Sequence, residues 1–438
     1  MSTFGIFTLG CKVNQYESEA ISELLEKEGL VRSHPEEICD IYIINTCTVT
    51  AESDRKCRQI IRRAIKKNPS AYVLVTGCLA ETDSESIKKI EGVDYICGNA
   101  DKTKIADAAI KLLLCGEKNS FPIAEITDID TSSFERMCIK KFERTRAYVK
   151  IEDGCESRCT YCIIPNARGK IRSKPFDDVI DEVRMLTLGG CREIVLTGIE
   201  TASYGRDIGS SLIELLEEID KIEGIGRIRL GSLDPSIMKE DFIKRIAKLK
   251  SLSHHFHISL QSGSDDVLKL MKRKYNSKMA LDCILALKKE MPDVMLTTDV
   301  IVGFPGESDQ NFNETVEFAK KAEFLMMHVF PYSKRKRTPA ATMDGQLDNA
   351  TKKERVARLM SVGKEIRKKL LNEEVNKNKA VTVLFEDYKD GYAHGHTDNF
   401  IEVRVKSDRS LHSIFGEVQV ISHDGNVITG KLINTEEI

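Results

Sequence analysis

Three cysteines stand close together in the segment Gly154-Cys-Glu-Ser-Arg-Cys-Thr-Tyr-Cys. Cys155, Cys159 and Cys162 follow the spacing C-x3-C-x2-C, which lets three thiolates meet at one metal centre at little cost in chain entropy. A closed zinc site needs four protein ligands, and no fourth cysteine or histidine lies nearby. A [4Fe-4S] cluster held by three cysteines instead leaves one iron free for S-adenosylmethionine (SAM), which electron transfer can cleave to a radical. The triplet therefore predicts a SAM-cleaving iron–sulfur centre, with zinc as the alternative.

A second set of cysteines follows three short apolar segments early in the chain. Each segment is rich in β-branched and aromatic residues, as buried strands are, and helix-like stretches at 16–28 and 52–67 follow the first two. Repeated strand–helix units form a parallel sheet, whose ligand site lies at the carboxyl ends of its strands. Three cysteines at three such ends predict a second cluster with an open iron; the alternative is three small buried residues. The segments are residues 4–10, 40–46 and 71–77, and they end at Cys11, Cys47 and Cys78.

The composition is that of a globular protein, with 41% hydrophobic and 31% charged residues in a chain of 438. This length predicts roughly two to four domains. No apolar run reaches the length of a membrane span and the N-terminus lacks a signal-peptide layout, so we expect a cytoplasmic protein without a membrane contact. Cysteines outside the two triplets are interpreted as core or surface thiols. A net charge of −2 leaves any RNA site to local basic patches.

The middle of the chain alternates between candidate strands and helices. Six such units predict an open, partial (β/α)6 barrel, because a closed barrel of this kind needs eight. An open side suits a macromolecular substrate, and the triplet at Cys155 follows the first strand, at the end where barrel enzymes do their chemistry. The expected strands are residues 147–152, 193–197, 227–231, 255–260, 295–302 and 326–330, and the expected helices are 177–188, 211–223, 239–249, 277–290 and 311–322.

Polar, glycine and aromatic residues gather where the expected barrel strands end. Glycine permits close approach of a ligand to the backbone, hydroxyl and carboxylate groups can bind an amino acid or ribose, and aromatic rings can stack on adenine. His254, His255 and His257 lie on one expected strand and are interpreted as local structure before metal ligands. The candidate SAM-binding residues are Tyr161, Thr197, Gly198, Ser232, Ser259, Gln261, Asp299, Gly303, Glu307, Phe330 and Tyr332.

The C-terminal part changes pattern after an expected helix at 352–376. Apolar and polar residues then alternate in segments separated by turns, which predicts a small all-β barrel of a type that often binds RNA; a structural appendage is the alternative. A basic run, Lys334, Arg335, Lys336 and Arg337, directly follows the last expected strand of the central barrel. These side chains border the expected active site, so they are candidates for contacts to RNA phosphates.

Several segments of the chain resemble the tRNA methylthiotransferase family. The likeness covers essentially the whole chain, whose parts are similar to the family's N-terminal methylthiotransferase domain, radical SAM domain and TRAM domain. On this basis the domains are expected at residues 1–118, 141–372 and 375–438, with a linker at 119–140. The segments that carry the resemblance are Thr8–Ser18, Asn45–Thr50, Cys162–Gly169 and Gly303–Glu307.

The resemblance is strongest to the branch that acts on N6-threonylcarbamoyladenosine next to the anticodon. It implies two [4Fe-4S] clusters and SAM as cofactors, tRNA as substrate, and hydrogen abstraction from C2 of the adenine ring by the SAM-derived radical. The cluster on Cys11, Cys47 and Cys78 would carry the sulfur that a second SAM methylates. The implied partner is an electron donor of the flavodoxin or ferredoxin type; the sulfur source stays unknown, and a monomer is expected. Glu200 stands where this branch more often carries histidine, which leaves the role of position 200 open.

Three other functions stay open at this point. The enzyme could methylthiolate isopentenyladenosine in tRNA, or a side chain of a ribosomal protein, with the same two clusters. A non-catalytic iron–sulfur protein that binds RNA is a third possibility from a different class. The modified nucleoside that disappears in a deletion strain separates the first two, and SAM cleavage by the reduced protein separates enzymes from the third.

Overall fold

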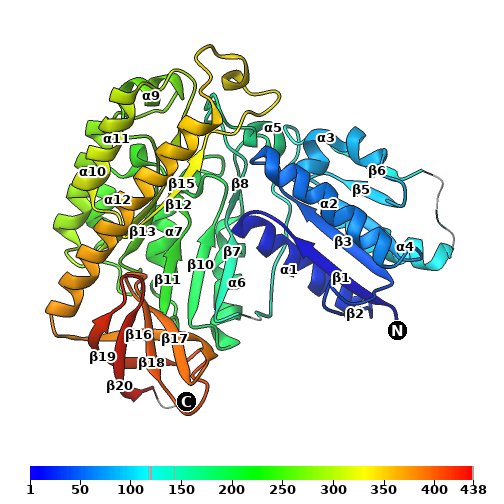
Figure 1. Ribbon diagram of the computed structural model, residues 1–438. Helices are drawn as coiled ribbons and strands as arrows, with labels where there is room; N and C mark the ends of the chain where they lie inside the picture. Colours follow the sequence, from blue (N-terminus) through cyan, green and yellow to red (C-terminus); the bar gives the residue numbers. More distant parts are fainter. Residues whose placement is uncertain (117, 119–120, 143, 437–438) are drawn as a thin grey trace.

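A computed structural model describes residues 1–116, 118, 121–142 and 144–436. An N-terminal α/β part, a central open barrel and a small C-terminal β-barrel follow one another along the chain, as Figure 1 shows. This architecture confirms the fold class predicted from the sequence. Within the described ranges no helix has both the length and the apolar character that a membrane crossing requires.

The N-terminal part is a parallel sheet of six strands in the order β2-β1-β3-β4-β5-β6. Both β3 and β4 are buried along their whole length, which explains their continuous apolar sequence. The last strand, β6, lies within the stretch expected to be a linker, whose first residues, 119–120, are outside the described part. The strands are β1 (Thr3–Thr8), β2 (Val31–Arg32), β3 (Ile41–Thr46), β4 (Tyr72–Gly77), β5 (Tyr95–Cys97) and β6 (Ile123–Glu125), and the helices are α1 (Lys12–Lys27), α2 (Ala51–Lys67), α3 (Cys78–Lys88) and α4 (Lys104–Cys115).

The central part is an open barrel of parallel strands. One sheet has the order β7-β10-β11 and the other β12-β13-β14-β15, and only Gly231 separates β11 from β12. All six expected strands are present at nearly the expected positions. The strands are β7 (Arg146–Lys150), β10 (Glu193–Thr197), β11 (Arg227–Leu230), β12 (Ser232–Leu233), β13 (His255–Gln261), β14 (Met295–Val302) and β15 (Met326–Pro331), and the helices are α6 (Phe176–Leu188), α7 (Leu212–Ile219), α8 (Glu240–Ile246), α9 (Asp265–Leu270), α10 (Ser277–Glu290) and α11 (Asp309–Ala322).

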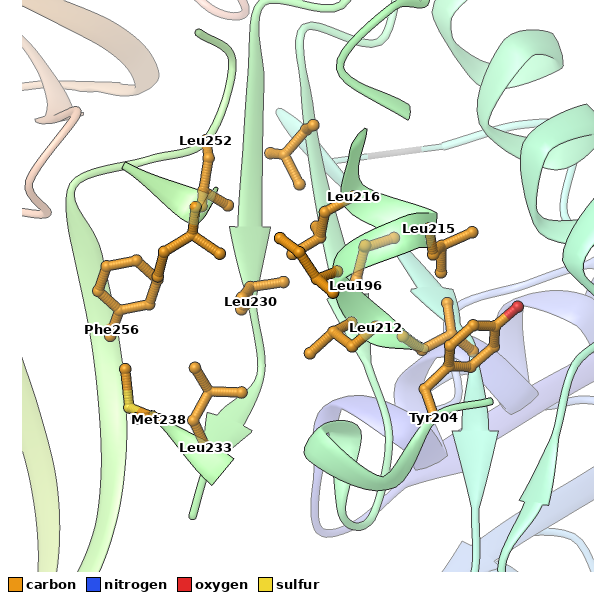
Figure 2. Packing of buried hydrophobic residues seen from close by; sticks show 14 of the residues in the cluster. Leu196, Tyr204, Leu212, Leu215, Leu216, Leu230, Leu233, Met238, Leu252 and Phe256 are labelled. Atoms are coloured by element: carbon orange, nitrogen blue, oxygen red, sulfur yellow. The ribbon is translucent and has the colours of Figure 1, made fainter. Parts of the chain in front are cut away.

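The two faces of the barrel strands differ in character. Outward side chains such as Leu196, Leu230 and Phe256 are buried in the core. Figure 2 shows Leu212 and Leu216 of α7 beside Leu196 and Leu230. Each such side chain contributes about 1.5 to 3 kcal/mol through burial. Inward side chains alternate with these. Those near the amino ends, such as Glu193 and Arg229, are buried, whereas others along the strands keep contact with solvent and line an open lumen. The half-buried or exposed inward residues include Tyr148, His257, Ser259, Gln261, Asp299, His328 and Phe330.

The C-terminal part is a closed barrel of five strands in the order β16-β17-β18-β20-β19, and it follows the long helix α12 (Asn349–Asn376). The alternating apolar segments 381–386, 401–405 and 416–421 of the sequence coincide with β16, β18 and β19. The other two strands, β17 and β20, were not predicted. Short polar strands such as β17, which reads Tyr-Ala-His-Gly-His-Thr, carry little apolar signal. The strands are β16 (Ala380–Lys389), β17 (Tyr392–Thr397), β18 (Glu402–Lys406), β19 (Phe415–His423) and β20 (Ile428–Thr435).

The C-terminal barrel docks on the amino ends of the central strands (Figure 1). Phe400, in the turn between β17 and β18, stacks on His255 at the start of β13 with 4.5 Å between ring centroids. Arg229 lies over the same ring at 4.9 Å and donates a hydrogen bond of 3.2 Å to the Asp398 carbonyl. The turn therefore forms the floor of the lumen, at the end opposite to the one where barrel chemistry is expected.

A buried carboxylate, Glu193 at the start of β10, organises this floor. Arg146 and Arg229 approach it to 2.7 and 3.0 Å, and Arg227 to 3.3 Å. Burial alone would raise the pKa of Glu193, but these arginines lower it to about 2. The carboxylate is thus ionised throughout the ordinary pH range and holds three cations in place.

Glu193→Gln tests this arrangement. A carboxyl whose pKa is lower in the folded state stabilises the fold above its unfolded pKa and ceases to do so as the pH falls toward its folded pKa. We expect the free energy of unfolding of the wild type to exceed that of the variant by about 3 kcal/mol near neutral pH. This difference should persist down to about pH 5 and shrink below about pH 4.5. Urea denaturation at a series of pH values measures it.

The matched control is Glu217→Gln, which removes a half-exposed carboxylate 2.7 Å from Arg245. Such surface pairs contribute about 0 to 1 kcal/mol, so this variant should be close to the wild type. A Glu193→Gln variant as stable as the control at neutral pH would show that Glu193 does not hold the floor together.

Candidate active site

The N-terminal cysteines meet at one edge of the six-stranded sheet. Cys11 directly precedes α1, Cys47 follows β3, and Cys78 is the first residue of α3. The loop that carries Cys11 lies against Cys47, because a Cβ at Gly10 would lie 2.9 Å from the Cys47 sulfur, and Gly10 has φ +102°. Glycine at position 10 is what lets these two loops approach.

The protonation of these thiols reflects their burial and their proximity to one another. Burial, followed by the neighbouring Cys78, raises the pKa of Cys47 to about 12. Burial also raises the pKa of Cys11. The Arg168 cation opposes this shift, and the neighbouring Cys78 adds to it. Without a bound cation the Cys11 and Cys47 thiols are protonated at neutral pH. A metal centre would have to displace the protons, so its binding would release them.

The second triplet lies on the loop that follows β8 (Glu152–Asp153). The Cys155 amide donates a hydrogen bond of 3.0 Å to the Gly169 carbonyl, and the Cys162 amide donates one of 3.1 Å to the Cys159 carbonyl. These bonds fold the loop back beside β9 (Arg172–Ser173), which pairs with β8. After burial, the charge of Cys162 contributes to the raised pKa of Cys155, and the charge of Cys159 contributes to the raised pKa of Cys162. Cys162 therefore lies within electrostatic reach of both other sulfurs.

Two side chains that the sequence did not assign contact this triplet. Arg273, just after α9, donates a hydrogen bond of 3.3 Å to the Cys159 sulfur and another of 2.6 Å to Asp234. The Cys155 thiol donates one of 3.3 Å to Glu200, whose role was left open. Burial and then the Glu200 carboxylate raise the pKa of Cys155. Glu200 stands at a strand end, where polar residues could be noticed, whereas nothing in the sequence pattern marks Arg273.

Arg168 connects the two triplets. Its Nε donates a hydrogen bond of 3.4 Å to the Cys78 sulfur, and its Nη1 lies 3.1 Å from Asp153, two residues before Cys155. The same guanidinium donates to Glu17 at 2.6 Å and to Asn14 at 2.6 Å. Arg168 is fully buried at the end of α5 (Ile164–Arg168), beside α3 (Figure 1). One side chain therefore joins helix α1, the candidate cluster ligand Cys78, and Asp153 of the central barrel, just before the second triplet.

The carboxylates around Arg168 are ionised because several cations surround them. Burial opposes ionisation of Glu17, but Arg168, Lys102 and Lys150 lower its pKa well below the usual range. The same balance, with Arg168 as the main opposing charge, lowers the pKa of Asp153 to about 2. Buried charges are tolerated only when they are paired in this way.

The chemistry of both triplets, three thiols each with an arginine donor at one sulfur, fits iron–sulfur clusters. In the described part of the chain, no three His, Cys, Asp or Glu side chains converge on a point that one metal ion could occupy. A cubane cluster spreads its cysteine ligands over separate irons, so its thiolates need not converge on one point. Each triplet also has an arginine donor at one sulfur, Arg168 at Cys78 and Arg273 at Cys159, as thiolate-bound clusters favour.

The residues expected to bind SAM fall into two groups. Most lie at or near the carboxyl ends of the barrel strands, on the side of the Cys155 triplet. Tyr161 packs edge-on against Phe304 at 6.5 Å, within that loop region. Asp299 faces the lumen, 3.4 Å from His257. The others at this rim are Thr197, Gly198, Ser232, Ser259, Gln261 and Phe330.

The remaining three expected SAM residues have structural roles. Glu307 accepts a hydrogen bond of 2.9 Å from the Gly303 amide and pairs with Arg355 of α12 at 2.6 Å. Tyr332 is 4% exposed and packs on Phe304. Glu307 and Tyr332 therefore anchor the strand-end loops and do not face the rim. Their polar and aromatic character resembled that of ligand-binding residues because burial cannot be read from residue type.

The basic run after β15 is a contact between the central barrel and the N-terminal part. Arg335 is buried and donates hydrogen bonds of 2.8 Å to Asp54 and 2.6 Å to Thr48. Arg337 donates one of 2.7 Å to the Thr82 carbonyl. Arg335 is therefore not accessible to RNA, contrary to the prediction. Lys334 and Lys336 are exposed, and so is Arg337 apart from its hydrogen bond to Thr82.

The histidines on β13 form a hydrogen-bonded chain in the lumen. Nε2 of His255 and Nδ1 of His257 both lie 3.0 Å from the Thr297 hydroxyl. Burial, followed by Arg229, lowers the pKa of His255 well below its usual value, so this imidazole is neutral. The chain orders one wall of the lumen, in line with the interpretation of these histidines as local structure.

Lys12, beside Cys11, also faces the lumen. Its charge lies within electrostatic reach of Arg229, Arg146 and Glu193, which stand on three neighbouring barrel strands. Solvent reaches Lys12 through the open side of the barrel, yet protein surrounds it closely enough for burial, and then Arg229, to lower its pKa to about 8. The sequence drew no attention to this lysine, because nothing in the strand pattern shows that α1 faces the barrel.

Comparisons with known proteins agree with this arrangement. A family described as the radical SAM superfamily matches residues 149–319, and one described as uncharacterized protein family UPF0004 matches residues 3–98. The threonylcarbamoyladenosine tRNA methylthiotransferase MtaB of Bacillus subtilis is 40% identical, over 96% of this chain and 94% of its own. A tRNA-2-methylthio-N(6)-dimethylallyladenosine synthase of Acetivibrio thermocellus is 34% identical, over 92% and 85%. The structure of the radical SAM methyltransferase TsrM of Kitasatospora setae, with cobalamin and a [4Fe-4S] cluster bound, has a TM-score of 0.56 at 16% identity and covers 78% of this chain and 77% of its own.

Arg168→Met tests the connection between the triplets. The substitution keeps much of the side-chain volume but leaves Glu17 and Asp153 without their shared guanidinium. Removal of one partner from a buried ion pair costs about 3 to 5 kcal/mol, so urea denaturation should show a loss of that size. Arg184→Met, at an exposed arginine 3.6 Å from Asp181, is the control and should change stability by less than about 0.5 kcal/mol. Equal stability of the two variants would contradict the role of Arg168.

Proposed function

The chain belongs to the tRNA methylthiotransferase family, in its threonylcarbamoyladenosine branch, and from this premise we propose that it methylthiolates C2 of N6-threonylcarbamoyladenosine in tRNA. The observation that carries the proposal is the pair of cysteine triplets joined by Arg168 at one end of an open barrel. An aromatic C–H offers neither an acidic proton nor a leaving group, so acid–base catalysis alone cannot replace it. Two iron–sulfur clusters and SAM supply the radical chemistry that such a substitution needs.

The protein residues hold and position these groups. In our proposal Cys155, Cys159 and Cys162 hold the cluster that binds SAM, while Arg273 donates a hydrogen bond to one of its thiolates. Polar groups at the neighbouring strand ends would bind the amino acid and ribose of SAM. Cys11, Cys47 and Cys78 would hold the second cluster across the Arg168 contact. Hydrogen bonds to ligand sulfurs stabilise the reduced state of a cluster, so Arg168 and Arg273 would each tune one potential.

The open barrel offers a way in for a nucleotide of a large RNA. The described strands β7 and β15 do not close on each other, and inward side chains along the lumen stay exposed. A base flipped out of an RNA loop can enter such a cavity, whereas the helical parts of the RNA cannot. The partly exposed Lys334, Lys336 and Arg337 lie beside this side of the barrel and are our candidates for phosphate contacts.

The character of the lumen favours this substrate over isopentenyladenosine. The isopentenyl group is apolar and would gain most from an apolar pocket. The inward residues are instead polar or charged at most positions, among them Lys12, His257, Asp299 and His328. A threonylcarbamoyl group carries a carboxylate, a hydroxyl and a urea-like link, which such a lumen can bind. We further propose a flavodoxin- or ferredoxin-type electron donor, a monomeric enzyme and a cytoplasmic location.

Mass spectrometry of nucleosides from total tRNA tests the function. A strain without this gene should lose 2-methylthio-threonylcarbamoyladenosine and accumulate its precursor, and a plasmid copy should restore it. A copy with Cys159→Ala should not, because the SAM-binding cluster would lack one ligand. Loss of the isopentenyl analogue instead would move the enzyme to the other branch. If no tRNA nucleoside changed, the proposal for an RNA substrate would be wrong.

Iron analysis tests the assignment of the cysteines. After anaerobic reconstitution the wild type should hold about eight irons and eight sulfides per chain. Simultaneous substitution of Cys155, Cys159 and Cys162 by alanine should leave about four, and so should substitution of Cys11, Cys47 and Cys78. Cys283→Ala, at a buried thiol near α8, is the control and should keep the full content. A triplet variant with unchanged iron would contradict the assignment of that triplet.

A further inference from the structure

Lys12 is a cation that faces the lumen and has no partner among the described residues. It is the first residue of α1 and follows the candidate cluster ligand Cys11. Helix α1 packs beside β7, at the side where the barrel is open (Figure 1). The Lys12 ammonium lies within electrostatic reach of Arg146 at the start of β7, Glu193 at the start of β10 and Arg229 within β11. The side chains of these three residues meet one another on the inner face of the barrel, so Lys12 faces the lumen. No hydrogen bond or ion pair to Lys12 is formed by the described residues.

The other cations near Lys12 already have partners. Arg146 and Arg229 share Glu193 at 2.7 and 3.0 Å. Lys150, further along the same strand as Arg146, pairs with Glu17 at 2.8 Å and with Asp153 at 2.7 Å. These charges are satisfied within the protein and are not available to a ligand without loss of an ion pair. Lys12 keeps its full hydrogen-bonding capacity, with three donors on its ammonium group.

The proposed substrate carries one anionic group apart from its phosphates. Its threonine carboxylate is attached through the carbamoyl link to N6. This nitrogen is bonded to C6, and ring atom N1 lies between C6 and C2. When C2 faces the Cys11 cluster, this substituent lies only a few bonds away, on the same side of the base. A carboxylate that enters a partly desolvated lumen needs a cationic partner, because an unpaired charge there is costly.

We propose that Lys12 binds the threonine carboxylate of the substrate and so selects threonylcarbamoyladenosine over adenosines with uncharged N6 substituents. The inference rests on the proposed function and adds to it the protein group that recognises the substrate. Lys12 is a specificity-determining residue in this account. Its place beside Cys11 couples recognition to chemistry, since the carboxylate contact would fix the distance from C2 to the N-terminal cysteines.

The test uses two RNA hairpins that differ in one group. One carries N6-threonylcarbamoyladenosine, and the other carries its analogue with the carboxylate converted to a primary amide. Binding to the reconstituted enzyme is measured by fluorescence anisotropy, and methylthiolation by kcat/KM, for the wild type, Lys12→Gln and Lys12→Arg. Lys27→Gln, at the exposed far end of the same helix, is the matched control.

The wild type and Lys27→Gln should bind and use the amide about 10- to 100-fold less well than the carboxylate, as expected for a lost charged hydrogen bond. Lys12→Gln should bind and use the two hairpins equally well, because the substitution lowers the affinity for the carboxylate hairpin and leaves that for the amide hairpin unchanged. Lys12→Arg should restore most of the discrimination. Iron content and SAM cleavage without RNA should be the same in all four proteins, which separates recognition from cluster assembly.

Two results would overturn the inference while the proposed function stands. A Lys12→Gln variant that weakens both hairpins equally would show that Lys12 binds a phosphate or supports the cluster. A wild type that does not distinguish the hairpins would show that nothing reads the carboxylate. A wild type with intact clusters that methylthiolates neither hairpin would instead count against the proposed function itself.

Discussion

The buried guanidinium of Arg168 is the contact on which the arrangement of both cysteine triplets depends. It joins α1 through Asn14 and Glu17, the first cysteine set through Cys78, and the barrel through Asp153. Planar arginine can serve three directions at once, which an ammonium group cannot do with the same geometry. The N-terminal sheet and the barrel are therefore held in one orientation by charge, at the place where two cofactors must face each other. An apolar contact there would be as stable but would fix the orientation less strictly.

The barrel separates its functions between its two ends. At the amino ends, the C-terminal barrel closes the lumen with Phe400 and the arginines around Glu193. At the carboxyl ends, the cysteine loops and polar strand ends remain accessible. The open side between them admits a nucleotide, and α1 places Lys12 beside that opening. A C-terminal module that closes the floor stabilises the barrel whether or not it also contacts RNA, so the appendage and RNA-binding interpretations are compatible.

The sequence predicted what is local and could not predict what is tertiary. Strand ends followed by cysteines are visible because apolar runs and helix patterns are local signals, and the six barrel strands appeared within a few residues of their places for the same reason. Arg168, Arg273 and Lys12 carry no such signal, since each acts on residues far away in the chain. Arg335 was predicted to contact phosphates because it belongs to a basic run. In the fold it pairs with Asp54, nearly three hundred residues earlier, which the sequence alone could not show.

In our proposal two neighbouring residues at the start of α1 serve different purposes, one in substrate choice and one in the radical chemistry. In our proposal Cys11 holds the cluster that takes part in the reaction, whereas Lys12 binds the substituent that identifies the substrate. Cysteine positions are constrained by the cluster and cannot vary without loss of the cofactor. The next residue is freer to change, because Lys12 is exposed and is not one of the proposed cluster ligands. A family that keeps its chemistry while it changes the N6 group it accepts could do so by substitutions of this kind, at lumen positions that border the cysteines but do not ligate metal.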